Sequence, residues 1–348
     1  MLLNEIFKLG VQKGASDVHL VVGEPPIVRI NGLLCRLTDF GSLTRKKAEE
    51  MILATLTPKQ KEQFVSSREM DISYELDSSE RFRVNLHFEK GNLGLAARII
   101  NAEPPTMKTT DMPEIVYRLA ELHQGLIIIT GPTGCGKSSS LAAIIDHINN
   151  SRAANIITLE DPIEFVFTPK QSIIRQRQYG FDFLSFPDAL KHVLRQDPNV
   201  IMVGEMRDLE TISATITLAE TGHLVLATLH TPNASQTIDR IIDIFPPYQQ
   251  DQIRIQLSMS LIGVIAQQLL PAPDGQKRVV AREIMINTPA VANLIRENKI
   301  VQLKTVIQTS SDDGMISMDQ CLQRLVKSKK VTAEVARQYA IDGASFED

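Results

Sequence analysis

The residues with the clearest chemistry lie in one short stretch, Gly131 to Ser138, which reads GPTGCGKS. Its G-x-x-x-x-G-K-S spacing is that of a phosphate-binding loop. Glycines let the backbone wrap around phosphate oxygens with its N–H groups pointing inward. Lys137 can reach the β- and γ-phosphates, and the Ser138 hydroxyl can ligate Mg²⁺. We therefore predict a site for ATP and Mg²⁺ made of Gly131, Pro132, Thr133, Gly134, Cys135, Gly136, Lys137, Ser138 and Ser139.

The segments on both sides of this loop have the order that the motif requires. Leu126 to Ile129 is a short apolar run typical of a strand, and apolar residues from Leu141 to Ile148 recur at helical spacing. The order strand, loop, helix places a bound anion at a helix N-terminus. A chance glycine-rich turn would not account for eight matching positions and both flanks.

A group of acids follows the next predicted strand, at 155–160. The strand runs into Glu160, Asp161, Pro162 and Glu164. Carboxylates at the carboxyl end of such a strand lie where open α/β sheets bind ligands, so one of them could orient or deprotonate the attacking water. A turn before proline explains Asp161 equally well, but it explains three acids in five residues less well.

A further carboxylate follows a third predicted strand, at 199–203. Glu205 lies nearest the end of this strand, and we expect it to support Mg²⁺, directly or through water. Asp208 is a residue type that caps helices, and we expect it to cap the helix predicted at 209–220.

Two histidines, His223 and His230, flank a fourth predicted strand. Seven residues of extended chain span ~23 Å, and the odd spacing puts the two side chains on opposite faces, so they cannot share a metal. His230, at the carboxyl end, can sense the γ-phosphate or an interface, whereas His223 is expected to have a structural or interface role. A helix predicted at 185–196 puts Arg195 in its last turn, where stabilising the helix dipole is as good an explanation as a phosphate contact.

The first hundred residues predict a small α+β domain with an antiparallel sheet. We expect a helix at 2–13, a strand at 17–22, and strands at 28–30 and 33–37 around an Asn31-Gly32 hairpin turn. Thr57 to Gln60 has the pattern of a capped helix start, with Pro58 at the first helical position.

The strand predicted at 81–88 is the clearest in the chain. Apolar residues take one face, and Arg81 and Arg83 lie on the other. This polar face is either solvated or meets a phosphate held by another domain or subunit, and Arg98 could join it from the next strand. Both explanations stay open.

Composition limits the class of protein. The chain has 348 residues, 43% of them hydrophobic, which predicts two domains with buried cores. A net charge of -4 gives no basic field for nucleic acid. The three cysteines are far apart, which suits a reducing cytosol and provides no four-cysteine zinc site. Without a long apolar run or a signal-peptide pattern, we expect a cytoplasmic protein that does not insert into the membrane directly.

Four blocks, GPTGCGKS, ITLEDPIEF, VGEMRDLETI and AETGHLVLATLHT, together resemble the ATPases of type II secretion and type IV pili. In that family they are called Walker A, Asp box, Walker B and His box. Residues 15–20 and 81–85 resemble its N-terminal PAS-like domain. The resemblance implies an α/β fold with a RecA-like P-loop ATPase core and C-terminal helices at 114–348. It also implies that the smaller α+β domain, at 1–100, is PAS-like. The Pro and Thr content of residues 101–113 predicts a linker between the two domains.

Two features resemble the retraction, or twitching-motility, branch of this family (PilT-type). The assembly and secretion ATPases have a long N-terminal extension and usually a four-cysteine zinc element, and this chain shows neither. Residues 290–297, AVANLIRE, resemble the retraction motif AIRNLIRE. They depart from it at Val291 and Ala292, and the second departure removes a charge. Gln267 to Pro271, QQLLP, also resembles this branch.

The family assigns roles to the acidic and phosphate-binding residues. Lys137 and Ser138 bind phosphate and Mg²⁺, Glu164 is the base that activates water, and Glu205 supports Mg²⁺ and the water network. His223 and His230 couple the nucleotide to a subunit interface. The arginines that could neutralise charge are Arg81, Arg83, Arg98 and Arg195.

The resemblance implies a homohexamer that works with an inner-membrane pilus platform protein, peripheral at the inner membrane and without nucleic acid. We expect an ATP-hydrolysing motor for type IV pilus retraction. A type II secretion or pilus-assembly motor is the alternative within the family. A RecA-like nucleic-acid translocase is disfavoured by the acidic charge, 5% aromatic residues and no Trp. Glu164 and Glu205 favour turnover over a slow regulatory switch.

Overall fold

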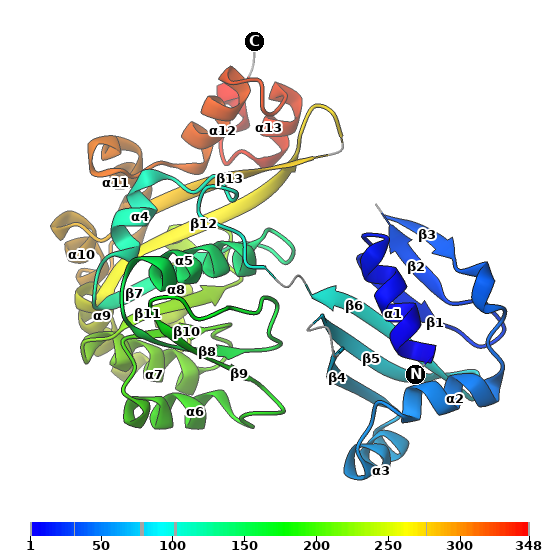
Figure 1. Ribbon diagram of the computed structural model, residues 1–348. Coiled ribbons are helices and arrows are strands. Elements are labelled where there is room, and N and C mark those ends of the chain that lie inside the picture. The colour runs from blue at the N-terminus through cyan, green and yellow to red at the C-terminus, as the bar shows by residue number, and fades with distance from the viewer. Residues whose placement is uncertain (1, 31, 77–79, 101–102, 276, 347–348) are drawn as a thin grey trace. The chain divides into compact units, whose positions relative to one another are not determined.

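The structure is a computed structural model of the chain. It describes residues 2–30, 32–76, 80–100, 103–275 and 277–346. The chain divides into two compact units (Figure 1). They comprise Met1–Glu103 with Glu164–Val166, and Pro104–Ile163 with Phe167–Asp348.

The smaller unit is an α+β structure built on a six-stranded antiparallel sheet, in the order β3-β2-β1-β6-β5-β4. The strands are β1 (Asp17–Leu20), β2 (Ile27–Ile30), β3 (Leu33–Arg36), β4 (Glu69–Glu75), β5 (Arg81–Glu89) and β6 (Asn92–Ile100). The helices are α1 (Leu2–Gln12), α2 (Arg45–Leu53) and α3 (Pro58–Ser67).

Local sequence signals explain these elements. In β5, Phe82, Val84 and Leu86 are fully buried, so the predicted alternation is confirmed. Helix α1 covers this apolar face, and the rings of Phe7 and Phe82 stack with their centroids 4.2 Å apart. The predicted capping box at the start of α3 is present. Strands β2 and β3 pair antiparallel as predicted, while Asn31 of the predicted turn lies outside the described residues.

The larger unit is built on a seven-stranded sheet, in the order β13-β12-β7-β11-β10-β8-β9. Its strands run parallel except β13, which is antiparallel to β12. They are β7 (Gly125–Thr130), β8 (Asn155–Glu160), β9 (Ile173–Gln178), β10 (Val200–Val203), β11 (Leu224–Leu229), β12 (Leu261–Pro271) and β13 (Arg278–Ile286).

Helices cover this sheet, and every residue of β7, β8, β10 and β11 is buried, as is typical of parallel strands between layers of helices. Residues of α6 to α11 form one apolar core with this sheet. The helices are α4 (Glu114–Ala120), α5 (Lys137–Ser151), α6 (Phe186–Val193), α7 (Leu209–Glu220), α8 (Ala234–Asp243), α9 (Pro247–Ser260), α10 (Pro289–Arg296), α11 (Leu303–Thr309), α12 (Met318–Lys327) and α13 (Ala333–Tyr339).

Strand order decides where the candidate chemistry meets. Strand β7 lies between β12 and β11, and its last residue, Thr130, is level with Leu229 of β11. Val203, at the end of β10, is level with Leu159 and Ala227. The segments that follow these parallel strands therefore leave the sheet at the same edge, where open α/β sheets bind ligands.

Part of the predicted linker is folded onto the larger unit. Met107 and Met112 are buried, and the Arg282 guanidinium donates to the carbonyls of Thr110 and Asp111 at 2.8 Å each. Apolar side chains and a buried cation thus anchor part of the segment that its Pro and Thr content predicts to be a linker. Residues 101 and 102 of that predicted linker lie outside the described residues.

Within the described part of the chain, no helix is both long enough and apolar enough to cross a membrane.

Candidate active site

The glycines of the loop after β7 are required by its geometry. Gly131 has φ +142°, and a Cβ there would lie 2.2 Å from the Gln267 carbonyl oxygen and 2.8 Å from Cys135 Sγ. Gly134 and Gly136 have φ of +78° and +88°, a region that favours glycine. Helix α5 begins at Lys137, directly after the loop. The backbone N–H groups of the loop therefore lie next to the helix N-terminus, where anions bind.

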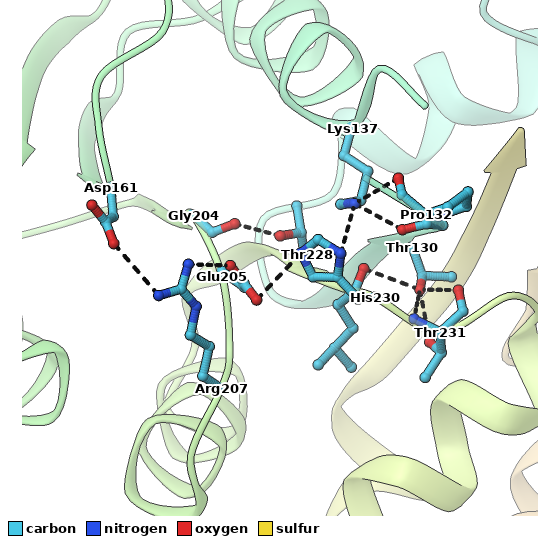
Figure 2. A network of polar contacts seen from close by, with 12 residues as sticks. Thr130, Pro132, Lys137, Asp161, Gly204, Glu205, Arg207, Thr228, His230 and Thr231 are labelled. Carbon is cyan, nitrogen blue, oxygen red and sulfur yellow. Dashed lines mark hydrogen bonds and ion pairs between the residues drawn. The ribbon is translucent and has the colours of Figure 1, made fainter. Parts of the chain in front are cut away.

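Lys137 folds back over this loop (Figure 2). Its Nζ donates to the carbonyl oxygens of Gly131 at 2.7 Å and Pro132 at 3.1 Å, and it lies 3.4 Å from His230 Nδ1. The ammonium group therefore sits at the mouth of the loop, beside the first residue after β11.

A chain of polar contacts continues from His230 across the edge of the sheet (Figure 2). His230 Nε2 lies 3.3 Å from Glu205 Oε1, and the other carboxylate oxygen of Glu205 accepts from Arg207 Nη2 at 2.8 Å. Arg207 Nη1 lies 3.6 Å from Asp161 Oδ2. Lys137, His230, Glu205 and Asp161 come from four separate blocks of sequence, and the fold joins all four.

The charges of this network act on Glu205, whose side chain is 24% exposed. Burial raises the pKa of the Glu205 carboxyl, but the hydrogen bond and charge of Arg207, with the charges of His230 and Lys137, outweigh it and lower that pKa. The hydrogen bond from Arg207 to Glu205 in turn raises the pKa of the guanidinium. Glu205 is therefore an ionised carboxylate at neutral pH.

Threonines tie the ends of the central strands together. The Thr130 hydroxyl accepts from the Thr231 N–H at 2.9 Å, and the Thr231 and Thr237 hydroxyls lie 2.6 Å apart. The Thr228 hydroxyl donates to the Gly204 carbonyl, which fixes the residue before Glu205. These bonds hold the loop, Glu205 and His230 on one rigid support.

Gln267 is a buried residue of the site that its sequence motif did not reveal. Its amide is fully buried on β12, donates to the Cys135 carbonyl at 2.9 Å and accepts from the Ser140 hydroxyl at 2.8 Å. It thus braces the loop and the first turns of α5. In the sequence, Gln267 could have been found as a glutamine inside the apolar run of β12. Arg207, which was also not predicted as a site residue, could have been found as a cation two residues after Glu205.

The three acids at and after the end of β8 have three different surroundings. Glu160 is buried and accepts hydrogen bonds from the Thr158 hydroxyl at 2.6 Å and the Gln176 amide at 3.1 Å, a structural arrangement. Asp161 belongs to the network in Figure 2. Glu164 is exposed, one residue beyond Ile163, whose N–H donates to the Gln178 side chain at 3.3 Å. Its role as base stays a prediction.

His223 and Arg195 lie at the opposite edge of the sheet from the phosphate loop. The His223 carbonyl accepts from the N–H of Gly125, the first residue of β7, at 2.9 Å. Arg195 is exposed in the short 3₁₀ turn that precedes β10. Within one chain neither is brought to Lys137, and a role at the nucleotide would require another subunit. The predicted cap is confirmed, because Asp208 accepts from the Thr211 N–H at 2.8 Å.

The three arginines predicted to neutralise charge from the smaller unit each have a carboxylate partner within that unit. Their ion pairs are Arg81–Glu75 at 3.3 Å, Arg83–Asp71 at 4.0 Å and Arg98–Asp17 at 3.0 Å. A solvated, ion-paired sheet face accounts for these contacts, and a phosphate-binding role for Arg81 or Arg98 stays a prediction.

Known proteins resemble this chain along nearly its whole length. Residues 97–344 match the type II/IV secretion system protein family. The chain is 43% identical to the type IV pilus retraction ATPase PilT of Pseudomonas aeruginosa over 340 residues, which is 98% of each protein. It is 44% identical to the twitching motility protein of Neisseria gonorrhoeae over 323 residues, 92% of this chain and 86% of that protein.

Solved structures agree with these sequences. The crystal structure of the pilus retraction motor PilT with bound ADP has a TM-score of 0.92 and 44% identity, covering 98% of this chain and 97% of the other. The ATPase DotB of Legionella pneumophila has a TM-score of 0.85 and 27% identity, covering 97% and 94%. The predicted α/β fold with a RecA-like core and the predicted ATPase activity are confirmed. The chain is therefore a nucleotide-using ATPase of the type II/IV secretion family and belongs to its pilus retraction, or PilT-type, branch.

Proposed function

We propose that this chain is a motor that converts ATP hydrolysis into retraction of type IV pili. The observation that carries the proposal is the polar network of Figure 2, which joins the phosphate loop, Asp161, Glu205 and His230 in one site. The proposal is also supported by the match between this chain and a retraction ATPase over 98% of its length.

The residues of this site suit Mg²⁺ with a nucleoside triphosphate. Glu205 is an ionised carboxylate, and Ser138 presents a partly exposed hydroxyl in the first turn of α5. Such hard oxygen ligands are the ones Mg²⁺ prefers, and the ion neutralises charge that develops on the phosphates. On nucleotide binding, Lys137 would exchange the carbonyls of Gly131 and Pro132 for phosphate oxygens.

Hydrolysis also requires a positioned water. Glu164 is the proposed base, and Glu205 holds the water network. His230 lies between Lys137 and Glu205, so it can respond when either of them changes partner. This is the residue through which nucleotide state would reach the rest of the His box.

Phosphoryl transfer needs positive charge opposite the γ-phosphate, and a second domain or subunit can supply it. We propose a homohexamer in which Arg81 or Arg98 plays this part, with His223 and Arg195 at subunit contacts. Of the predicted domains 1–100, 101–113 and 114–348, the first would swing against the last. Because residues 106–112 pack on the larger unit, the joint would lie before Thr106.

The partner of the motor is proposed to be a platform protein of the inner membrane. The chain would then be a peripheral protein on the cytoplasmic side of that membrane, without nucleic acid. The number of pili on the cell surface distinguishes a retraction motor from an assembly motor.

Deletion of the gene, with scoring of surface pili and twitching, tests the proposal. Many non-retracting pili and lost twitching are expected, restored by the wild-type gene and not by Lys137→Ala. Cells without pili would instead favour an assembly motor, and unchanged pili with impaired secretion would favour a type II secretion motor.

A further inference from the structure

A cavity of about 340 Å³ lies in the larger unit, lined by residues that take no part in the nucleotide site. Its walls come from the predicted linker, from β13, from the segment before α12 and from α12 itself. The lining residues include Met112, Pro113, Arg282, Met315, Cys321 and Arg324.

Arg282 is a buried cation in this wall, 4% exposed. Its two Nη groups donate to the carbonyls of Asp111 and Thr110, and its buried Nε has no hydrogen-bond partner among the described residues. No carboxylate in the described part of the chain hydrogen-bonds this guanidinium. Burial lowers the pKa of Arg282 to about 10, so it stays charged at neutral pH. Its direct hydrogen-bond partners are neutral carbonyls, and the charge of Asp111 supports it without a hydrogen bond, so this buried charge is only partly compensated.

The remaining charges of the lining leave this positive charge in excess. Arg324 of α12 adds a second cation. Asp111 also lines the cavity, but its side chain is 75% exposed and pairs with Lys330 at 2.9 Å. Most of the other lining residues are apolar. An apolar wall beside excess positive charge fits a ligand with an apolar body and an anionic head.

We propose that this cavity binds a small organic carboxylate with an apolar body. Its volume is in the range of small-molecule sites, ~300–1,000 Å³. The carboxylate faces Arg282 and Arg324, and the apolar body packs against Met112 and Met315.

The ligand would also contact the predicted linker. Met112 and Pro113 belong to the predicted linker, and Arg282 already holds the two residues before them. An occupant therefore fastens this segment to β13 and α12. A consequence for turnover rests on the proposed function, whereas binding itself does not, so the test below measures binding.

Cys321 provides the readout because it lines the cavity and is partly exposed. The full chain is labelled with iodoacetamide, and each cysteine is followed by peptide mass spectrometry in hexanoate, hexanol or hexylammonium at equal ionic strength. Hexanoate at twice its dissociation constant is expected to slow labelling of Cys321 about threefold, with exposed Cys35 unchanged. Equal protection by hexanol, or no protection by hexanoate, overturns the proposal.

Variants test the part that charge plays. Arg324→Gln is expected to weaken protection by hexanoate about fivefold, while Arg240→Gln, an exposed arginine at the end of α8, leaves it unchanged. Arg282 also holds the linker, so Arg324→Gln is the informative change and Arg282→Lys is its charge-preserving companion. Equal hexanoate affinity in Arg324→Gln and the wild type contradicts the proposed ion pairing.

Discussion

Two side chains, Arg207 and His230, contact the Glu205 carboxylate, one at each oxygen. Arg207 takes one oxygen at 2.8 Å, and His230 lies 3.3 Å from the other, with Lys137 beyond it. A carboxylate that is to hold Mg²⁺ must exchange at least one of these partners. In the proposed mechanism, a stronger Glu205–Arg207 pair would therefore make the site less ready to accept Mg²⁺.

The coupling between Glu205 and Arg207 is expected to depend on pH. The folded chain lowers the pKa of Glu205 below its usual 4.5, so the stabilisation is complete above that value and is lost as the pH falls through the lowered pKa. A double-mutant cycle with Glu205→Gln and Arg207→Gln, followed by urea unfolding, should give about 0.5–1 kcal/mol at pH 7 for this partly exposed pair. A coupling that is the same at acid pH would contradict the ion pair.

Gln267→Leu should weaken nucleotide binding without removing catalytic groups. It leaves the buried Cys135 carbonyl and Ser140 hydroxyl without their partner, a cost of about 1–3 kcal/mol. We expect the KM for ATP to rise about tenfold or more, with a smaller change in kcat. Gln268→Leu, on the other face of the same strand, is the matched control, and equal kinetics in the two variants would exclude the bracing role.

Among helices and strands, features that depend on neighbouring residues could be predicted from the sequence, whereas the pairing of distant strands could not. The capping box before α3, the Asp208 cap and the alternation of β5 each depend on a few neighbouring residues, and all three are present. Strands β4 and β9 have no comparably clear local pattern and were not predicted. The pairing of β12 with both β7 and β13 depends on contacts between distant segments.

The same limit applies to the site. The phosphate loop, Glu205 and His230 could be placed because each follows a predicted apolar strand. Gln267 meets a carbonyl 132 residues away, and that contact depends on the register between β12 and β7. Arg207 stands beside Glu205 in sequence, but only the turn after β10 directs it back to the carboxylate.

Gly131→Ala should disrupt the loop even without nucleotide. The added Cβ would lie 2.2 Å from a backbone oxygen that cannot move without shifting β12, and φ is +142°. At Gly134 nothing lies within 4 Å of such a Cβ, so Gly134→Ala carries only the backbone cost, about 1–2 kcal/mol. Thermal unfolding of the nucleotide-free chain should show a lower Tm for Gly131→Ala than for Gly134→Ala. The reverse order would contradict the close approach of β12.

For the whole molecule, the source of the positive charge that phosphoryl transfer needs opposite the γ-phosphate has still to be identified. In the larger unit Lys137 points to the phosphate loop, while Arg207 is already paired with Glu205. The proposed assembly completes the site with an arginine of the smaller unit, and this is why turnover should depend on more than one chain.

Removing that arginine should abolish turnover in the assembled protein and leave ADP binding intact. We expect Arg81→Gln or Arg98→Gln to lower kcat about a thousandfold. Arg36→Gln, an ion-paired arginine on the edge strand of the same sheet, is the control and should retain activity. Full turnover in both Arg81→Gln and Arg98→Gln would exclude these residues as the source of the charge.

The proposed mechanism depends above all on Glu205 serving hydrolysis at the site that the four sequence blocks share. Turnover and ATP affinity of Glu205→Gln, measured beside Glu210→Gln from the exposed first turn of α7, test this most directly. We predict that Glu205→Gln binds ATP with Mg²⁺ but hydrolyses it at least about a hundredfold more slowly, while Glu210→Gln behaves as the wild type. Wild-type turnover in Glu205→Gln would contradict the assignment.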